Sequence, residues 1–219
     1  GAGPGGLTAG AYLAQHGLQV AIFDQHYVAG GCATMFTRGS KSERYNFDVG
    51  LHYIGDCAPG GRIPTILDGL GIELGFREMD PDGFDTLVFP DFEFKIPASM
   101  DRYQQRLNER FPTERKGIAR YMRLVREVEH MGRQSAQRGD AMRSAGMIWQ
   151  ALTKGRLVAR NQDSTIGAFL DTCTQDPNLR AVLLGQSGDY GLPPSKVSAL
   201  LHCGLAAHYF SGAYYPEGG

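Results

Sequence analysis

Apolar and polar residues follow two different periods along the chain, and each period predicts one type of secondary structure. Residues 4–17 predict a helix that ends at a glycine, because apolar residues recur there at helical spacing: Leu7, Ala11 and Ala14. The apolar run 18–23, which leads into Asp24, and the alternating stretch 44–55 are both typical of strands. The chain therefore begins as an α/β protein.

The pattern changes after residue 60. Residues 62–70 predict a short helix, and residues 77–97 predict a β-hairpin with strands at 86–89 and 92–97 around a Pro-Asp turn. This antiparallel pair indicates a second, substrate-facing domain. Helical spacings dominate the remainder, with helices expected at 101–131 (divided in two by Pro112), 140–160, 165–170 (capped by Ser164), 178–185 and 195–210.

Composition sets the broad class. Hydrophobic residues make up 42% and charged residues 21% of the 219 residues, as in globular proteins, and no apolar run approaches a membrane span. No two cysteines lie at CxxC spacing, and cysteine and histidine do not cluster, so we expect reduced thiols and no metal site. The four cysteines are Cys32, Cys57, Cys173 and Cys203. Reduced thiols suit an intracellular enzyme.

The net charge of −1 hides a strong asymmetry. Residues 101–160 hold 14 basic and 6 acidic residues, whereas residues 1–100 hold 6 basic and 12 acidic ones. The middle segment thus differs in kind from its neighbours. Its basic residues alternate with glutamates and no recognition module is visible, so we expect no nucleic-acid partner.

The glycines at the start of the chain give the clearest indication of a binding site. Gly1, Gly3 and Gly6 form a GxGxxG pattern at the beginning of the predicted helix. In such a pattern the glycines allow a tight turn, close approach to a pyrophosphate and close packing of the helix, whose N-terminus faces the phosphates. Asp24, 18 residues after Gly6, is placed to accept hydrogen bonds from a ribose with a free 2′-hydroxyl. We interpret the pattern as a site for FAD or NAD rather than NADP; the alternative is a structural turn without a phosphate.

The ends of the chain suggest a piece of a longer protein. The glycine pattern starts at residue 1, so the strand that should lead into it is missing, and the last residues stop at a glycine pair. We expect a chain truncated at both ends.

Three further motifs accompany the GxGxxG pattern. They are the Gly30-Gly31 pair, the stretch 47–55 (FDVGLHYIG) and the tail 208–219 (HYFSGAYYPEGG). Together with the glycine pattern they resemble the phytoene desaturase superfamily of flavoproteins, within it most closely the retinol saturase and carotenoid isomerase branch. The resemblance implies a Rossmann-like FAD-binding domain of amine-oxidase-type topology with an inserted α+β substrate domain. We expect the FAD-binding part over residues 1–76 and the substrate domain over 77–219.

The resemblance also implies which residues would contact FAD. Those expected along the pyrophosphate are Gly1, Gly3, Gly6, Gly30 and Gly31; Asp24 would meet the adenosine ribose, and Gly50 and Leu51 would pass near the isoalloxazine ring. Family members commonly carry Glu where this chain has Asp24. The second flavin motif of the family would lie beyond Gly219.

The implied reaction is hydride exchange between the flavin and a carbon–carbon double bond of an apolar polyene, a carotenoid or retinoid that is desaturated, saturated or isomerised. Aromatic and histidine side chains would steer the polyene: His52, His208, Tyr209 and Tyr214. The alternative for each of the four is ordinary packing.

A polyene substrate dissolves in lipid, so we expect peripheral membrane contact through the helical segment 101–160. Within it, apolar side chains lie beside cations, as in an interfacial helix: Met147, Ile148, Trp149, Leu152 and Leu157 beside Lys154, Arg156 and Arg160. The alternative is a solvated helical pair. The expected location is intracellular, at a membrane surface or otherwise in the cytoplasm.

Two other functions remain open from the residues. A flavin amine oxidase would use the same cofactor frame, although the stretch 47–55 and the tail favour the desaturase type. A lipid-binding protein of the GDP-dissociation-inhibitor type shares the fold but has no need of the intact glycines and Asp24.

Overall fold

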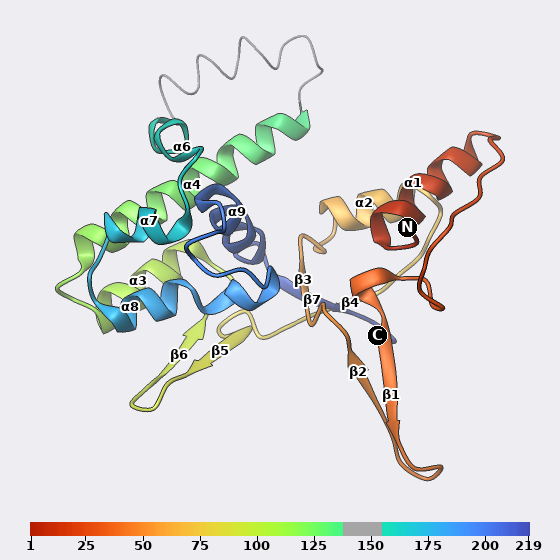
Figure 1. Cartoon of the computed structure of the whole chain (residues 1–219), viewed down its shortest axis with the longest axis horizontal. Helices are drawn as coiled ribbons and strands as arrows, with labels where there is room; N and C mark the ends of the chain where they lie inside the picture. Colours follow the sequence, from red (N-terminus) through yellow and green to blue (C-terminus); the bar gives the residue numbers. More distant parts are fainter. Residues whose placement is uncertain (138–154) are drawn as a thin grey trace. The chain divides into compact units, whose positions relative to one another are not determined.

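The computed structural model describes residues 1–137 and 155–219, and the side chains of all of these except 134–137. The chain divides into two compact units (Figure 1). Unit 1 comprises Gly1–Met79 and Ala213–Gly219, and unit 2 comprises Asp80–Gly212. Helices and small sheets make the protein mixed α/β, as the sequence predicts.

Unit 1 contains three helical segments and five strands among its described residues. In chain order they are α1 (Pro4–Gln15), the 3-10 turn η1 (Gly31–Ala33), β1 (Met35–Gly39), β2 (Arg44–Asp48), β3 (Ile54–Gly55), α2 (Arg62–Gly69), β4 (Phe76–Glu78) and β7 (Ala213–Pro216). β1 and β2 form an antiparallel hairpin, and β7 lies between β3 and β4 in an antiparallel sheet. The C-terminal strand, expected in the substrate domain, is therefore part of unit 1.

Helix α1 forms as predicted, but the strand expected at 18–24 does not. These residues have no regular secondary structure and pair with no strand, and the Phe23 side chain is 84% exposed. The run still packs on α1, since a Cβ added at Gly10 would lie only 2.7 Å from Ile22 Cδ1. A strand needs a neighbour for its N–H and C=O groups, and the part of unit 1 that the structure describes offers none here.

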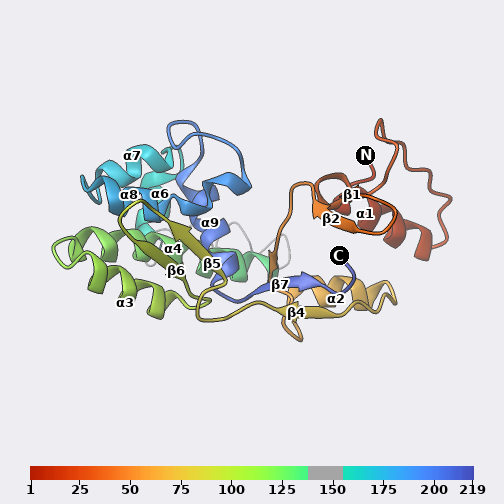
Figure 2. The same cartoon turned by 90° about the horizontal axis from the view of Figure 1, so that it is seen from below.

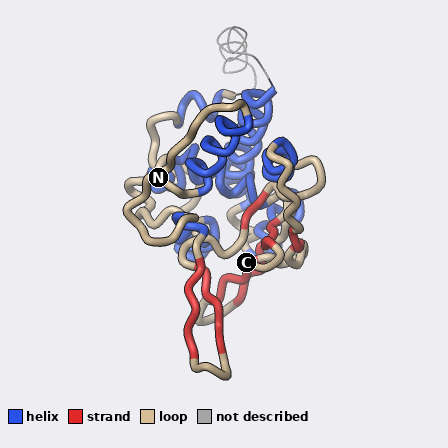
Figure 3. The backbone as a smooth tube through the Cα atoms, turned by 90° about the vertical axis from the view of Figure 1, so that its right-hand side faces the viewer, coloured by secondary structure: helices blue, strands red, loops and turns tan. Residues whose placement is uncertain are grey.

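The β1–β2 hairpin is regular but exposed. Figure 3 shows its two strands side by side, joined by a turn. Phe36 pairs with Phe47 in the register, and the two rings stack with centroids 5.4 Å apart. The expected strand 44–55 is divided, because the chain leaves β2 after Asp48 and pairs again only at Ile54.

Unit 2 is mostly helical. Its described elements are β5 (Asp85–Val88), β6 (Glu93–Ile96), α3 (Met100–Arg110), α4 (Arg115–Gln137), α6 (Arg156–Asn161), α7 (Ile166–Asp171), α8 (Pro177–Leu183), η2 (Gly185–Asp189) and α9 (Ala199–Tyr209). The predicted hairpin is confirmed as β5–β6, and Pro112 separates α3 from α4 as expected. The cap of α7 is Thr165 rather than Ser164: its hydroxyl accepts a hydrogen bond from the Ala168 N–H.

Helix α4 organises the core of unit 2. It packs against α3, α6 and α9 (Figure 2). Its buried side chains recur at helical spacing and are almost completely shielded from water: Ile118, Tyr121, Met122, Leu124 and Val125. This apolar face fixes the positions of the surrounding helices.

The proposed membrane segment lies largely outside the described residues, which omit Met147, Ile148, Trp149, Leu152 and Lys154. Leu157, expected to face a bilayer, is instead buried with 2% exposure. Its N–H donates a 2.8 Å hydrogen bond to the Glu127 carboxylate, which anchors the start of α6 on α4. None of the helices in the described ranges is both long enough and apolar enough to cross a membrane.

Candidate functional site

The glycine pattern and Asp24 lie together in unit 1. The Ala2 N–H donates to Asp24 Oδ2 at 2.6 Å, and the His26 N–H donates to Oδ1 at 2.8 Å. The Gly30 N–H donates to the Ala2 carbonyl at 2.7 Å. The loop before α1, the acid and the glycine pair thus form one connected arrangement, as the motif predicts.

Three glycines in this arrangement are required by its geometry, one of them Gly30 with φ +122°. A Cβ at Gly6 would lie 1.9 Å from the Gly1 carbonyl oxygen, so only glycine allows the turn to meet the first turn of α1. Gly31 has φ +57°, and a Cβ there would lie 3.1 Å from Gly3 Cα. Gly1 and Gly3 themselves would make only ordinary contacts through a Cβ. The bare backbone leaves the N-terminus of α1 open to an anion.

Asp24 has the chemistry expected of a ribose ligand. The hydrogen bonds from the His26 and Ala2 N–H groups lower the pKa of its carboxyl group, so the group is ionised. Each carboxylate oxygen accepts one hydrogen bond in the structure and keeps a second lone pair for a hydroxyl donor. The residues present therefore fit the adenosine half of a dinucleotide.

Gly50 and Leu51 follow β2 beside the glycine pair. A Cβ at Gly50 would lie 3.2 Å from the carbonyl oxygen of Cys32 in η1. The Val49 N–H donates to the Thr34 carbonyl at 3.0 Å, and Leu51 is 40% exposed. The Phe47–Gly55 motif is thereby held against the Gly30–Gly31 loop with Leu51 facing outward.

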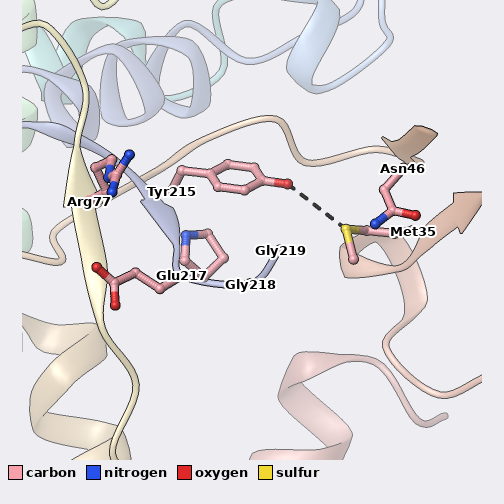
Figure 4. Close-up of a pocket in the computed structure, with 8 residues that line it drawn as sticks. Met35, Asn46, Arg77, Tyr215, Glu217, Gly218 and Gly219 are labelled. Carbon is pink, nitrogen blue, oxygen red and sulfur yellow. Dashed lines mark hydrogen bonds between the residues drawn. The ribbon is translucent and has the colours of Figure 1, made fainter. Parts of the chain in front are cut away.

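The same motif also meets the C-terminal tail. Ile54 pairs with Tyr214, and Gly55 with Ala213, between β3 and β7. A cleft of about 580 Å³ opens beside this junction (Figure 4). It is lined by Met35, Asn46, Arg77, Tyr215, Pro216, Glu217, Gly218 and Gly219. Residues 47–55 are thus joined to the last residues of the tail by strand pairing, and residues 215–219 of the tail line the cleft.

Asp48 is the polar centre of this junction. Its Oδ1 accepts a 2.8 Å hydrogen bond from the Tyr215 hydroxyl, and its Oδ2 lies 3.8 Å from His52 Nδ1. The hydrogen bond to Asp48 raises the pKa of Tyr215, because ionising the phenol would place two negative charges together. The Tyr215 ring crosses from β7 toward Met35 on β1 (Figure 4). Asp48 is 21% exposed and His52 68% exposed, so the histidine is accessible from solvent.

The four expected catalytic residues are distributed over both units. His52 and Tyr214 lie in unit 1, whereas His208 and Tyr209 lie at the end of α9 in unit 2. Tyr214 is 8% exposed within β7, and burial raises the pKa of its phenol. Tyr209 is 5% exposed and its ring lies 5.9 Å from that of Phe84. Their roles in a reaction stay predictions.

Three polar residues with defined partners are not predicted by the sequence patterns. Asp48 and Tyr215 were not selected, although the FDVGLHYIG and YYPEGG motifs contain them. In unit 2, buried His202 lies between two phenols: the Tyr121 hydroxyl is 3.1 Å from Nε2 and the Tyr190 hydroxyl 2.9 Å from Nδ1. Burial lowers the pKa of His202 to about 4, so the imidazole is neutral.

Comparison with protein families supports the dinucleotide reading. Residues 1–70 match the family model described as an NAD(P)-binding Rossmann-like domain. These residues contain α1, Asp24 and the glycine pair, and they end with α2. The match confirms the predicted Rossmann-like fold class and shows a dinucleotide-binding domain at this end of the chain.

The full chain is also similar to named enzymes. All-trans-retinol 13,14-reductase of Danio rerio is 31% identical over 232 residues, and that of Rattus norvegicus is 32% identical over 232 residues. Both alignments cover 100% of this chain, which spans only 37% and 36% of the two relatives. Prolycopene isomerase 2, chloroplastic, of an Oncidium hybrid cultivar is 26% identical over 123 residues, 55% of this chain and 20% of that protein. The relatives confirm the resemblance to the phytoene desaturase superfamily and to its retinol saturase and carotenoid isomerase branch.

Proposed function

We propose, from homology to retinol 13,14-reductases and prolycopene isomerases, that the complete protein is an FAD-dependent oxidoreductase acting on carbon–carbon double bonds of a polyene lipid. The substrate class is retinoid or carotenoid. Because the relatives from Danio rerio and Rattus norvegicus described above are named reductases, reduction of one double bond is the reaction to assay first.

The residues present support a dinucleotide with a free ribose 2′-hydroxyl, and we assign it as FAD. Gly1, Gly3 and Gly6 would border the pyrophosphate with Gly30 and Gly31, and ionised Asp24 would accept from the ribose hydroxyls. Gly50 and Leu51 would lie toward the isoalloxazine ring. When bound, FAD supplies hydride exchange at its N5 position.

The chain's own side chains would bind and orient the polyene. His52 is exposed, and its Nδ1 lies 3.8 Å from Oδ2 of Asp48. We assign His52 to contact with the substrate near the reacting bond and Asp48 to holding His52 and Tyr215 in position. Tyr214, Tyr209 and His208 would supply aromatic contacts along the polyene.

One observation carries this proposal: the Phe47–Gly55 motif and the C-terminal tail meet beside a cleft, joined by strand pairing and by the Tyr215–Asp48 hydrogen bond. A flavin amine oxidase would share the glycine pattern. The Phe47–Gly55 motif and the tail, which are joined here by pairing and a hydrogen bond, favour the desaturase type.

A lipophilic substrate also supports peripheral membrane contact and an intracellular location, which we include in the proposal. The test is flotation of the complete protein with liposomes, with and without Met147, Trp149 and Leu152 replaced by Ser. Equal flotation of the two proteins would remove this segment as an anchor.

The function is tested by a visible absorption spectrum of the complete protein before and after denaturation, followed by assays with retinoids and carotenoids. Release of FAD and conversion of a polyene support the proposal. Release of FAD with oxidation of an amine and no polyene turnover would favour the amine oxidase. A colourless protein that takes up no added FAD would favour a lipid-binding protein.

A further inference from the structure

A second cleft lies in unit 2, along the first turns of α4 and the end of α7. Its volume is about 470 Å³, and the described residues that line it include three cations and no carboxylate. The lining residues are Lys116, Gly117, Ala119, Arg120, Arg123, Thr172 and Cys173. The spacing of the cations, four and then three residues, puts them on one face of α4. Nothing in the proposed oxidoreductase reaction uses this face.

The central cation is held in place by neutral groups. Arg120 Nε donates a 3.0 Å hydrogen bond to Thr172 Oγ1, which itself donates to the Phe169 carbonyl at 2.7 Å. The guanidinium group is therefore fixed through its Nε, while its two terminal nitrogens carry further N–H donors. A fixed guanidinium loses less side-chain entropy when it binds an anion.

The floor of the cleft is backbone. A Cβ at Gly117 would lie 1.9 Å from the Cys173 carbonyl oxygen, so α4 rests directly on the end of α7. The three cationic side chains line the cleft beside this contact. Lys116 and Gly117 also belong to the first turn of α4, whose unpaired N–H groups add positive potential.

The nearby carboxylates already have partners. Asp171 is 2.6 Å from Arg180, and Glu114 accepts a 2.7 Å hydrogen bond from the Thr174 hydroxyl. Glu127 is 3.4 Å from Arg123 but also accepts from the Leu157 N–H at 2.8 Å. None of these contacts among the described residues involves Lys116 or Arg120, so both cations can meet an external anion.

We propose that this cleft binds a phosphate group, either of a soluble phosphate compound or of an anionic lipid headgroup. A phosphate dianion matches the charge of several cations around one point, and a guanidinium can bind two of its oxygens at once. The Arg120 guanidinium is the primary ligand, and Lys116 and Arg123 close the site on either side.

The test compares two variants of the complete protein that lose the same charge. One carries Lys116→Gln and Arg123→Gln in the cleft and keeps Arg120 with its bond to Thr172. The control carries Arg133→Gln and Lys196→Gln, two exposed cations outside the cleft. Thermal unfolding first establishes that both variants fold. Binding is then measured calorimetrically with inorganic phosphate, and by co-sedimentation with phosphatidylcholine vesicles with and without phosphatidic acid.

We expect the cleft variant to lose about 30-fold in affinity for at least one phosphate probe, since each cation near a phosphate surface contributes roughly a factor of five. The control should bind like the unmodified protein. A loss with inorganic phosphate alone identifies a soluble ligand, and a loss with phosphatidic acid vesicles identifies a lipid headgroup. Equal binding of both variants to both probes, or no binding by the unmodified protein, would overturn the proposal.

Discussion

The Tyr215 hydroxyl and the Asp48 carboxylate are joined by a 2.8 Å hydrogen bond although 167 residues separate them in the chain. The bond fastens the end of β2 to β7, the central strand of its sheet. It links the two motifs on which the family resemblance most depends. The phenol stays protonated because Asp48 raises its pKa.

Tyr215→Phe should lower the free energy of unfolding by about 1 kcal/mol, because a partly exposed hydrogen bond to a charged group is lost. The effect should vanish as the pH rises through the raised pKa of Tyr215, since the folded protein then also loses the proton. Urea unfolding of the complete protein at several pH values measures this. The control is Tyr45→Phe on β2, the strand that ends at Asp48, where the side chain is 57% exposed. Equal losses in the two variants would show that the bond contributes nothing specific.

His52→Gln should lower kcat/KM for a polyene by about 100-fold, the usual contribution of a positioned acid–base or polar group, with FAD content unchanged. His16→Gln, at the exposed end of α1, should leave turnover intact. Steady-state kinetics and the flavin absorbance of each variant distinguish the two effects. Unchanged kcat/KM for His52→Gln in an active, FAD-loaded protein would contradict the assigned role.

Local patterns were sufficient for much of the fold. Apolar spacing and glycine or proline boundaries predicted α1, α2, the β5–β6 hairpin and the division between α3 and α4. The strand expected at 18–24 was wrong because a strand also depends on a neighbour, which the sequence of the strand does not contain. β1 was missed, since its residues Met35–Gly39 mix polar and apolar side chains and are exposed throughout.

In the candidate site, too, residues placed by a local motif could be predicted, whereas residues placed by distant contacts could not. Gly6 and Asp24 were predictable because the motif that places them is short and continuous. Asp48 was not, because its role depends on Tyr215 at the other end of the chain. His202 lies between Leu201 and Cys203 in an apolar helix, and nothing near it in the sequence indicates the two tyrosines that bind it.

Gly6→Ala should abolish most FAD binding, with at least a tenfold loss of affinity, because the new Cβ would lie 1.9 Å from the Gly1 carbonyl oxygen. Gly5→Ala is the matched control: it lies in the same turn of α1, and its Cβ would meet nothing within 4 Å. Fluorescence titration of the apoprotein with FAD measures both. Comparable affinity in the two variants would show that the tight turn does not shape the cofactor site.

Gly117→Ala should destabilise the protein by about 1–3 kcal/mol, since its Cβ would collide with the Cys173 carbonyl and push α4 away from α7. Gly132→Ala on the same helix has nothing within 4 Å and should stabilise by about 0.5–1 kcal/mol through helix propensity. Chemical denaturation reports both changes. A stabilising Gly117→Ala would mean that the two helices are not in direct contact.

His202 should make the protein acid-sensitive between pH 6.5 and about 4, the ordinary pKa of histidine and the lowered pKa of the buried side chain. In this range the unfolded chain binds a proton that the folded protein does not. The free energy of unfolding therefore decreases by up to about 3 kcal/mol as the pH falls from 6.5 to about 4, and the contribution of His202 is fully present above pH 6.5. His202→Gln keeps a donor and an acceptor for Tyr121 and Tyr190 but does not titrate. Urea unfolding across this range should give a flatter pH dependence for the variant; an identical slope would show that His202 does not cause the acid sensitivity.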